Sequence, residues 1–393
     1  MAVVTDRLRL EIDAMANGGD GIARREGKAV FVPGAIPGDV ADVEIVDVKK
    51  RFERARLIDI AEPSPQRVAA PCRFFGACGG CTWQHADYSA QLEWKAATMA
   101  GQLRHLGGIE DVDIRPIVAP GEPYHYRNRI DLHVDRGRPA MVRAGSNDLV
   151  PIDLCLLADH AIVDLFGRLG DLRGVGRLAL RTGVNTGETI VVLDGELPLS
   201  SDDWGVPFGG DDIVFHEVVA DHAFQITGTA FFQNNTAGAE ELVHLVAAAA
   251  TIEPGDRVLD AYAGGGLFTA TVTGDAGEVV AVESDPLALE DLLVNTDVEV
   301  IEADVADGLA ELPADWDVVI VDPPRVGLGP EVTRQLAELR PAVIASVSCE
   351  VASFARDAAA LMGAGYRLEW VQPIDMFPQT PHIESVARFS LEV

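Results

Sequence analysis

Residues 236–393 alternate short apolar stretches with stretches of helical pattern, and this alternation limits the fold more than any other feature of the chain. Nearly continuous apolar stretches are typical of parallel strands that are buried on both faces of a sheet. They are RVLDAY (257–262), VVAVES (279–284), VEVIEAD (298–304), WDVVIVDPP (316–324) and AVIASVSC (342–349). A helical stretch at 237–250 precedes them, and two more strands are expected at 367–374 and 384–393. The pattern predicts an α/β fold with a doubly wound, Rossmann-like sheet.

Residues 1–62 differ, because apolar and polar residues alternate there in short segments separated by Gly- and Pro-rich turns. This pattern predicts a small β-barrel. The barrel has one basic stripe, which fits either a solvated strand edge or an RNA-binding face: Lys49, Lys50, Arg51, Arg54 and Arg56.

Between these two regions, residues 63–71 read as a linker, followed by a helix at 88–106 and strands at 126–135 and 188–195. We therefore expect three domains: a barrel at 1–62, a central α+β domain at 63–235, and the doubly wound domain at 236–393.

The net charge of −31 ordinarily argues against a polyanionic partner. The charge is uneven, however, since residues 1–62 have a net charge of only −2. No apolar stretch approaches the roughly 20 residues that span a bilayer, and the first residues lack a secretion signal. We expect a soluble, cytoplasmic protein that does not bind membranes.

Acidic residues end successive predicted strands of the doubly wound region. Glu283, Asp304 and Asp322 each follow an apolar stretch, and the first strand runs into the glycine-rich turn AGGGLF. Such turns let the backbone approach a ligand, although this one lacks the dinucleotide pattern GxGxxG. Carboxylates suit hydroxyl and amino groups better than phosphates. S-adenosylmethionine therefore fits as a cofactor better than NAD.

Two sets of cysteines carry further chemistry. Cys349 stands between a strand and a helix, where the helix dipole favours a thiolate nucleophile over an inert buried thiol. The second set favours an iron–sulfur cluster over zinc because of its spacing, Cys72-x5-Cys78-x2-Cys81, with Cys155 as a fourth ligand.

Taken together, these residues resemble the RNA (uracil-C5-)methyltransferases that have a TRAM domain and a [4Fe-4S] cluster, the 23S rRNA type. The resemblance covers essentially the whole chain. It is carried, in order, by GGDGIARREGKAVFVPGAIPGDV, PCRFFGACGGC, PYHYRNRIDLHV, FFQNN, DAYAGGGLF, DPPR, SVSCEVASFARD and MFPQTPHIESVARF. It implies a monomeric enzyme that makes 5-methyluridine in RNA, with 23S rRNA as the favoured substrate and tRNA as the alternative.

The resemblance also assigns roles to matching residues. Cys349 is the expected nucleophile, which adds to C6 of uracil, and Glu384 is the base that removes the C5 proton. Phe231 or Phe232 is expected to support the target base. The residues expected to hold S-adenosylmethionine are Gln233, Tyr262, Glu283, Asp304 and Asp322.

The chain departs from the family pattern beside these residues. Glu350 and Val351 follow the nucleophile where Asn-Pro is usual, and we expect the extra carboxylate to oppose thiolate formation. Leu267 stands where a polar residue is usual. These departures leave open an RNA-binding homologue that has lost activity. A zinc-stabilised methyltransferase of small molecules is the third interpretation.

Overall fold

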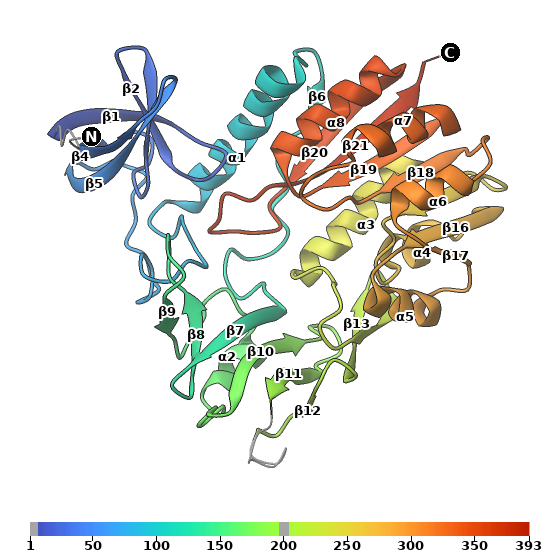
Figure 1. The fold of residues 1–393 in the computed structure, drawn as a ribbon, viewed down its shortest axis with the longest axis horizontal. Coiled ribbons are helices and arrows are strands. Elements are labelled where there is room, and N and C mark those ends of the chain that lie inside the picture. The colour runs from blue at the N-terminus through green and yellow to red at the C-terminus, as the bar shows by residue number, and fades with distance from the viewer. Residues whose placement is uncertain (1–6, 196–203, 393) are drawn as a thin grey trace. The chain divides into compact units, whose positions relative to one another are not determined.

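The computed structural model describes residues 7–195 and 204–392. It divides into two compact units (Figure 1). The first comprises Met1–Gly101, Arg143–Asn147 and Phe377–His382, and the second comprises Gln102–Val142, Asp148–Met376 and Ile383–Val393. Both units are discontinuous in sequence, and the division into three domains stays a prediction.

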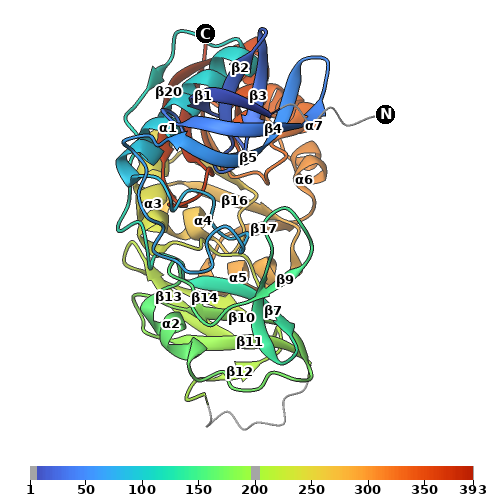
Figure 2. The ribbon, with the colours of Figure 1, turned by 90° about the vertical axis from the view of Figure 1, so that its left-hand side faces the viewer.

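The first unit contains a closed five-stranded barrel, as the alternating pattern predicts. Its strand order is β1-β2-β3-β5-β4, and its core is made of small aliphatic side chains such as Ala23, Val30 and Val43. The strands are β1 (Arg7–Met15), β2 (Gly21–Arg25), β3 (Lys28–Val32), β4 (Val40–Val48) and β5 (Phe52–Glu62). Figure 2 views this barrel from a second direction.

A helix expected at 88–106 is present as α1 (Tyr88–Gln102), and its last turn continues as the π-helical turn η1 (Leu103–Gly107). Within the first unit, Trp94 of α1 packs edge-on against Trp83, with ring centroids 5.7 Å apart.

The second unit has a six-stranded sheet of order β12-β11-β10-β7-β8-β9 and a separate hairpin, β13-β14. The expected strands at 126–135 and 188–195 are present as β7 and β11. The elements are β7 (Arg129–Asp135), β8 (Arg138–Val142), β9 (Leu149–Pro151), α2 (His160–Phe166), β10 (Val175–Thr182), β11 (Thr189–Gly195), β12 (Phe208–Gly209), β13 (Val214–Val219) and β14 (His222–Thr227).

The second unit also contains the predicted doubly wound sheet, which has eight strands in the order β17-β16-β15-β18-β19-β21-β20-β6. Strands β15 to β19 are parallel, and β21 runs antiparallel to both β19 and β20. The strands are β6 (Asp113–Ile114), β15 (Arg257–Ala261), β16 (Glu278–Glu283), β17 (Glu299–Glu302), β18 (Val318–Val321), β19 (Val343–Ser348), β20 (Tyr366–Ile374) and β21 (Glu384–Leu391).

Helices connect the parallel strands, and α3 packs against β18, β19 and β21. They are α3 (Thr236–Ala250), α4 (Leu267–Val272), α5 (Pro286–Asn295), α6 (Val305–Glu311), α7 (Gly329–Leu339) and α8 (Val351–Gly363). The strand order reverses between β15 and β18, and ligands bind beside such switch points at the carboxyl ends of the strands. Among the described helices, none combines the length and the apolar character needed to cross a membrane.

Candidate functional site

The carboxyl ends of the parallel strands bring the predicted cofactor residues to one edge of the sheet. Ala261 of β15 pairs with Val282 of β16 and with Val321 of β18. The residues that follow these three are Tyr262, Glu283 and Asp322, so they stand side by side at the switch point. The sequence predicted the acidic strand ends, and the strand order β16-β15-β18 brings these residues side by side.

The glycine-rich turn after β15 takes left-handed backbone conformations that require glycine at most of its positions. Gly264 and Gly266 have φ values of 56° and 90°, and Tyr262 has a φ of 68°, which is unusual for a residue with a side chain. The Gly264 N–H donates a 2.7 Å hydrogen bond to the Glu283 carboxylate. The carboxylate also accepts from the N–H groups of Ser284 and Asp285. Glu283 therefore shapes the glycine-rich turn.

Tyr262 and Asp304 interact electrostatically at this edge. Burial raises the pKa of the Tyr262 hydroxyl to about 12, and the negative charges of Asp304 and Asp357 add to the shift. Asp304 itself is exposed and caps α6 by accepting from the Ala306 N–H at 3.0 Å. Tyr262 is thus a neutral phenol at physiological pH, able to donate a hydrogen bond.

The segment after β14 positions Gln233, which is buried. The Asn128 side-chain amide donates to the Gln233 carbonyl oxygen at 3.0 Å, and Asn235 caps α3 by accepting from the Gly238 N–H. Phe232 is also buried and packs against Phe224, with ring centroids 5.6 Å apart. Phe231, in contrast, is 61% exposed, so of the two phenylalanines it is the one available for a base to stack on.

Cys349 and Glu384 lie at neighbouring positions on two adjacent strands. Ser348, the last residue of β19, pairs with Ser385 of the antiparallel strand β21. Cys349 is the next residue after Ser348, and Glu384 is the residue before Ser385, so the two face each other across the strands. The Ser385 hydroxyl donates to the Ser348 carbonyl oxygen at 3.4 Å, which ties the two strand ends together.

Burial and negative neighbours disfavour the charged forms of this pair. Burial raises the pKa of the Cys349 thiol to about 12, and the charges of Glu384 and Asp322 add to the shift. Burial and the charge of Asp322 also raise the pKa of the Glu384 carboxyl well above its usual value. Asp322, through burial and the charge of Asp260, has its pKa raised to about 7. Burial and these charges therefore favour the thiol form of Cys349 at neutral pH.

The positive charge of Arg325 opposes the raised pKa values of Cys349 and Glu384. Arg325 is part of the DPPR motif, but the sequence predicted no role for it. Its charge lowers the pKa of both Cys349 and Glu384. The Ser353 hydroxyl donates to the Arg325 carbonyl oxygen at 2.9 Å, and Asp357 accepts from the Leu328 N–H at 2.9 Å. These bonds fix the loop that carries Arg325 to the first turns of α8, which begins just after Cys349. Its position directly after the acidic strand end was the signal that could have identified it.

Glu350 has a structural role beside Cys349. Its side chain caps α8 by accepting from the Ala352 N–H at 3.3 Å. Burial and the charges of Glu384 and Asp322 raise the pKa of Cys349. A carboxylate at a helix N-terminus is stabilised by the helix dipole and by the N–H donors there. The departure from Asn-Pro therefore supplies a helix cap. Leu267, the other departure, is buried in the first turn of α4.

The predicted cluster cysteines fall in both units. Cys72, Cys78 and Cys81 belong to the first unit and Cys155 to the second. Cys78 accepts from the Gly80 N–H at 3.4 Å, and Cys81 accepts from the Gln84 amide at 3.1 Å. Over residues 7–195 and 204–392, however, no group of three or more His, Cys, Asp or Glu side chains is arranged to hold a metal ion. The iron–sulfur cluster is thus not confirmed, and no step below depends on it.

The fold and the site define a class of protein: a doubly wound enzyme with strand-end carboxylates for a nucleoside-type cofactor and a cysteine–glutamate pair beside them. Comparison with known proteins narrows this class. Residues 4–58 match the TRAM domain family. A Gloeobacter violaceus protein named as an uncharacterized RNA methyltransferase is 34% identical, and the match covers 96% of this chain and 94% of the relative. A Halalkalibacterium halodurans protein of the same description is 30% identical over 98% and 97% of the two chains.

Among solved structures, the tRNA (uracil-54, C5)-methyltransferase of Pyrococcus abyssi, determined with S-adenosyl-L-homocysteine, matches with a TM-score of 0.78. It is 28% identical, and the match covers 97% of this chain and all of that chain. The identity and coverage of the sequence relatives show that the protein belongs to this family of TRAM-containing RNA methyltransferases.

Proposed function

We propose that the protein transfers a methyl group from S-adenosylmethionine to C5 of a uridine in RNA, through a covalent bond between Cys349 and C6 of the base. The observation that carries this proposal is the facing pair Cys349 and Glu384, held by the Ser348–Ser385 register beside the switch point. The structural neighbour from Pyrococcus abyssi acts on uracil C5 and was determined with S-adenosyl-L-homocysteine, which supports the same reaction and cofactor here.

The residues at the switch point fit S-adenosylmethionine. Glu283 and Asp304 offer carboxylate oxygens for hydroxyl and amino groups, and Tyr262 offers a neutral hydroxyl. Gln233 and Asp322 are the other two residues expected to hold the cofactor. When bound, S-adenosylmethionine supplies an electrophilic methyl group. The protein must then place uracil C5 against that methyl group and exclude water, which the buried positions around Gln233 and Glu384 favour.

Uracil C5 becomes nucleophilic only after a thiolate adds to C6. The Cys349 thiol gives its proton to water, its sulfur bonds to C6, and the electron pair of the C5–C6 double bond moves into an enolate. C5 would then take the methyl group as its bond to the sulfonium sulfur breaks, with that electron pair staying on the sulfur of the S-adenosylhomocysteine that leaves. Glu384, as a carboxylate, removes the C5 proton, the double bond re-forms, and the Cys349 sulfur leaves with the electrons of its bond to C6.

Arg325 favours both deprotonated forms that these steps need. Its charge lowers the pKa of the nucleophile and of the base, against the burial that raises them. Since Cys349 and Glu384 must each lose a proton, the rate of the reaction is expected to rise with pH.

Trapping the covalent complex tests the proposal. With S-adenosylmethionine and RNA containing 5-fluorouridine, wild-type protein should form a stable adduct, because C5 then carries no removable proton. Cys349→Ala should form none. With ordinary RNA, Glu384→Gln should accumulate the methylated adduct and release it slowly. The adducts are measured by denaturing gel electrophoresis and mass spectrometry.

Glu350→Gln is the matched control, since it changes the other carboxylate beside Cys349 and keeps an acceptor for the helix cap. It should turn over without accumulating adduct. Methylation by Cys349→Ala at the wild-type rate would overturn the assignment of the nucleophile, and failure of Glu384→Gln to form any adduct would give Glu384 another role. Methylation of RNA by the wild type would also exclude the alternative of an RNA-binding homologue that has lost activity.

The class of RNA is a separate proposal. Sequence resemblance favours 23S rRNA, whereas the structural neighbour supports tRNA, since it acts on uracil 54 of tRNA. Purified rRNA and tRNA from a strain that lacks the gene distinguish the two, because only the natural substrate should gain one methyl group at one site.

The iron–sulfur cluster also stays a proposal. Three of its expected ligands, Cys72, Cys78 and Cys81, lie on one loop, and N–H donors reach two of the sulfurs. Iron and acid-labile sulfide analysis of protein purified without oxygen tests it: stoichiometric iron supports the cluster, and protein without iron contradicts it.

A further inference from the structure

We propose that Asn295, at the end of α5, is a positioning residue that holds the glycine-rich turn in the shape that binds the cofactor. The inference rests on the proposed function only in that this turn holds S-adenosylmethionine. Asn295 is not among the residues predicted from the sequence to be functional. Its contacts, however, join the turn to the β13-β14 hairpin.

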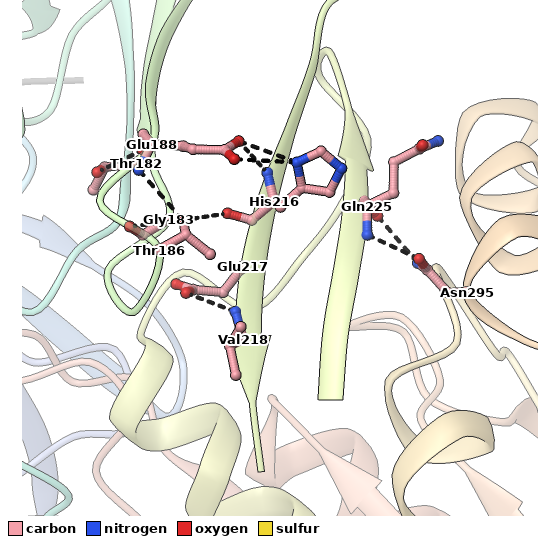
Figure 3. A network of polar contacts seen from close by, with 9 residues as sticks. All are labelled: Thr182, Gly183, Thr186, Glu188, His216, Glu217, Val218, Gln225 and Asn295. Carbon is pink, nitrogen blue, oxygen red and sulfur yellow. Dashed lines mark hydrogen bonds and ion pairs between the residues drawn. The ribbon is translucent and has the colours of Figure 1, made fainter. Parts of the chain in front are cut away.

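The Asn295 side chain makes three hydrogen bonds to backbone groups. Its amide donates to the Gly265 carbonyl oxygen at 2.8 Å and to the Gln225 carbonyl oxygen at 3.0 Å. Its side-chain oxygen accepts from the Gln225 N–H at 2.8 Å. Figure 3 shows Asn295 reaching from α5 to the backbone of Gln225 on β14. One side chain thus fixes both a residue of the cofactor turn and a residue of the hairpin.

The turn is held at two consecutive residues by opposite kinds of bond. Glu283 accepts from the Gly264 N–H, and Asn295 donates to the Gly265 carbonyl oxygen. A peptide group between two such anchors has little freedom to rotate. Glu283 is also expected to contact the cofactor, so its bond to the turn can change when the cofactor binds. The Asn295 bond does not involve the cofactor and holds the turn in either case.

A second contact shows that α5 is docked on the hairpin one turn earlier. Asp291 accepts from the Thr227 N–H at 2.9 Å and from the Thr227 hydroxyl at 2.6 Å. Asp291 and Asn295 are four residues apart, so they lie on the same face of the helix. Asp291 therefore secures the helix to the hairpin, while Asn295 extends that attachment to the turn.

Close packing leaves the turn no alternative position towards α5. A Cβ atom at Gly266 would lie 2.9 Å from the Thr296 Cγ2 atom and 3.0 Å from the Leu292 Cδ1 atom. The turn thus packs closely against α5 at Gly266, and loss of the Asn295 bond would favour its movement away from the helix. That direction changes where its backbone stands relative to Glu283.

The test compares two substitutions at Asn295. Asn295→Asp keeps an acceptor for the Gln225 N–H but places a carboxylate against the Gly265 carbonyl oxygen. Asn295→Ala removes all three bonds. Both remove the one bond to the cofactor turn, that to the Gly265 carbonyl oxygen, and should therefore weaken binding of S-adenosylhomocysteine, measured by calorimetry on the full chain, by about three- to tenfold, the range for loss of that single hydrogen bond. The KM for S-adenosylmethionine should rise by a similar factor, while kcat at saturation stays within about twofold.

Two control variants separate this role from general support of the fold. Gln225→Ala leaves the backbone groups that Asn295 contacts and should bind S-adenosylhomocysteine as the wild type does. Thr227→Val removes the hydroxyl bond to Asp291, so it should lower the melting temperature without changing cofactor affinity.

Each outcome decides a different point. Failure of the wild type to bind S-adenosylhomocysteine would overturn the proposed function itself. Wild-type binding together with unchanged affinity in both Asn295 variants would overturn only the role of Asn295. Equal loss of affinity in Thr227→Val and Asn295→Asp would also overturn it, since docking of α5 alone would then account for the effect.

Discussion

Carboxylates crowd the edge of the doubly wound sheet, and their pKa values follow from that crowding. Asp260 is fully buried on β15, where its Oδ2 accepts from the Thr269 hydroxyl at 2.5 Å. Its Oδ1 atom has no hydrogen-bond partner among the described residues. Burial raises the pKa of Asp260 to about 7, and the charge of Glu283 adds to the shift. The site therefore favours a protonated Asp260.

The raised pKa makes stability depend on pH. When the pKa of a carboxyl is higher in the folded than in the unfolded protein, the folded state is favoured while the carboxyl is protonated. For Asp260 this stabilisation is lost as the pH rises from about 4 to about 7. Asp260→Asn, which carries no charge at any pH, should flatten the fall in melting temperature over this range. It should be more stable than the wild type at pH 8, by up to about 4 kcal/mol.

Thermal unfolding between pH 4.5 and 8 measures this effect, with Asp275→Asn, an exposed carboxylate, as the control. Parallel pH profiles for the wild type and Asp260→Asn would show that Asp260 ionises in the folded protein without cost.

The residues of the site that lie at strand ends could be predicted, because each follows an apolar stretch and parallel strands end at a common edge. Glu283, Asp322 and Cys349 are of this kind. Arg325 and Asn295 could not be predicted in the same way. Their roles depend on contacts between elements, and the Asn295 side chain meets Gln225, 70 residues away in sequence.

At the scale of elements, most strands of the doubly wound sheet were predicted within a few residues, whereas several strands of the six-stranded sheet and the β13-β14 hairpin were missed. The apolar stretch 342–349 is β19 (Val343–Ser348), and 257–262 is β15 (Arg257–Ala261). β10 (Val175–Thr182) was missed although most of its residues are buried, and β13 was missed because exposed residues interrupt its apolar ones. Strand order was beyond the sequence pattern, since the insertion of β21 between β19 and β20 depends on antiparallel pairing over long range.

The glycine-rich turn gives a prediction at this scale. Gly266→Ala places a Cβ atom at a φ of 90° and within 3.0 Å of α5. We expect it to destabilise the protein by about 1–3 kcal/mol and to abolish measurable binding of S-adenosylhomocysteine. Chemical denaturation and calorimetry provide the two measurements.

Gly274→Ala is the matched control, because no atom lies within 4 Å of its added Cβ and its φ is not in the left-handed region. If Gly266→Ala bound S-adenosylhomocysteine as tightly as Gly274→Ala, the turn would not be part of the cofactor site.

At the scale of the whole molecule, the net charge of −31 raises the question of how the chain binds RNA. The β4-β5 hairpin of the barrel holds part of the answer. Lys49 lies 3.1 Å from Asp47, and Arg56 pairs with Glu44, so acidic neighbours partly neutralise both. Lys50 and Arg51 at the tip are exposed and have no ion pair within the described residues. The charges of these two stripe residues are therefore available to phosphates.

Lys50→Ala combined with Arg51→Ala should therefore weaken RNA binding and reduce the dependence of log Kd on log salt by about 1–2 units. Filter binding at several salt concentrations measures both quantities. Arg9→Ala is the control in the same barrel, since Arg9 is already paired with Asp42 at 2.8 Å. An unaltered salt dependence in the double variant would exclude this hairpin from the RNA interface.

The most direct test of the account identifies the methylated nucleoside. RNA from a strain that lacks the gene is incubated with the protein and S-adenosylmethionine, digested to nucleosides, and analysed by liquid chromatography and mass spectrometry. The account predicts 5-methyluridine with the wild type and none with Cys349→Ala. A methyl group on any other nucleoside or at any other position of uridine, or equal 5-methyluridine from Cys349→Ala, would contradict it.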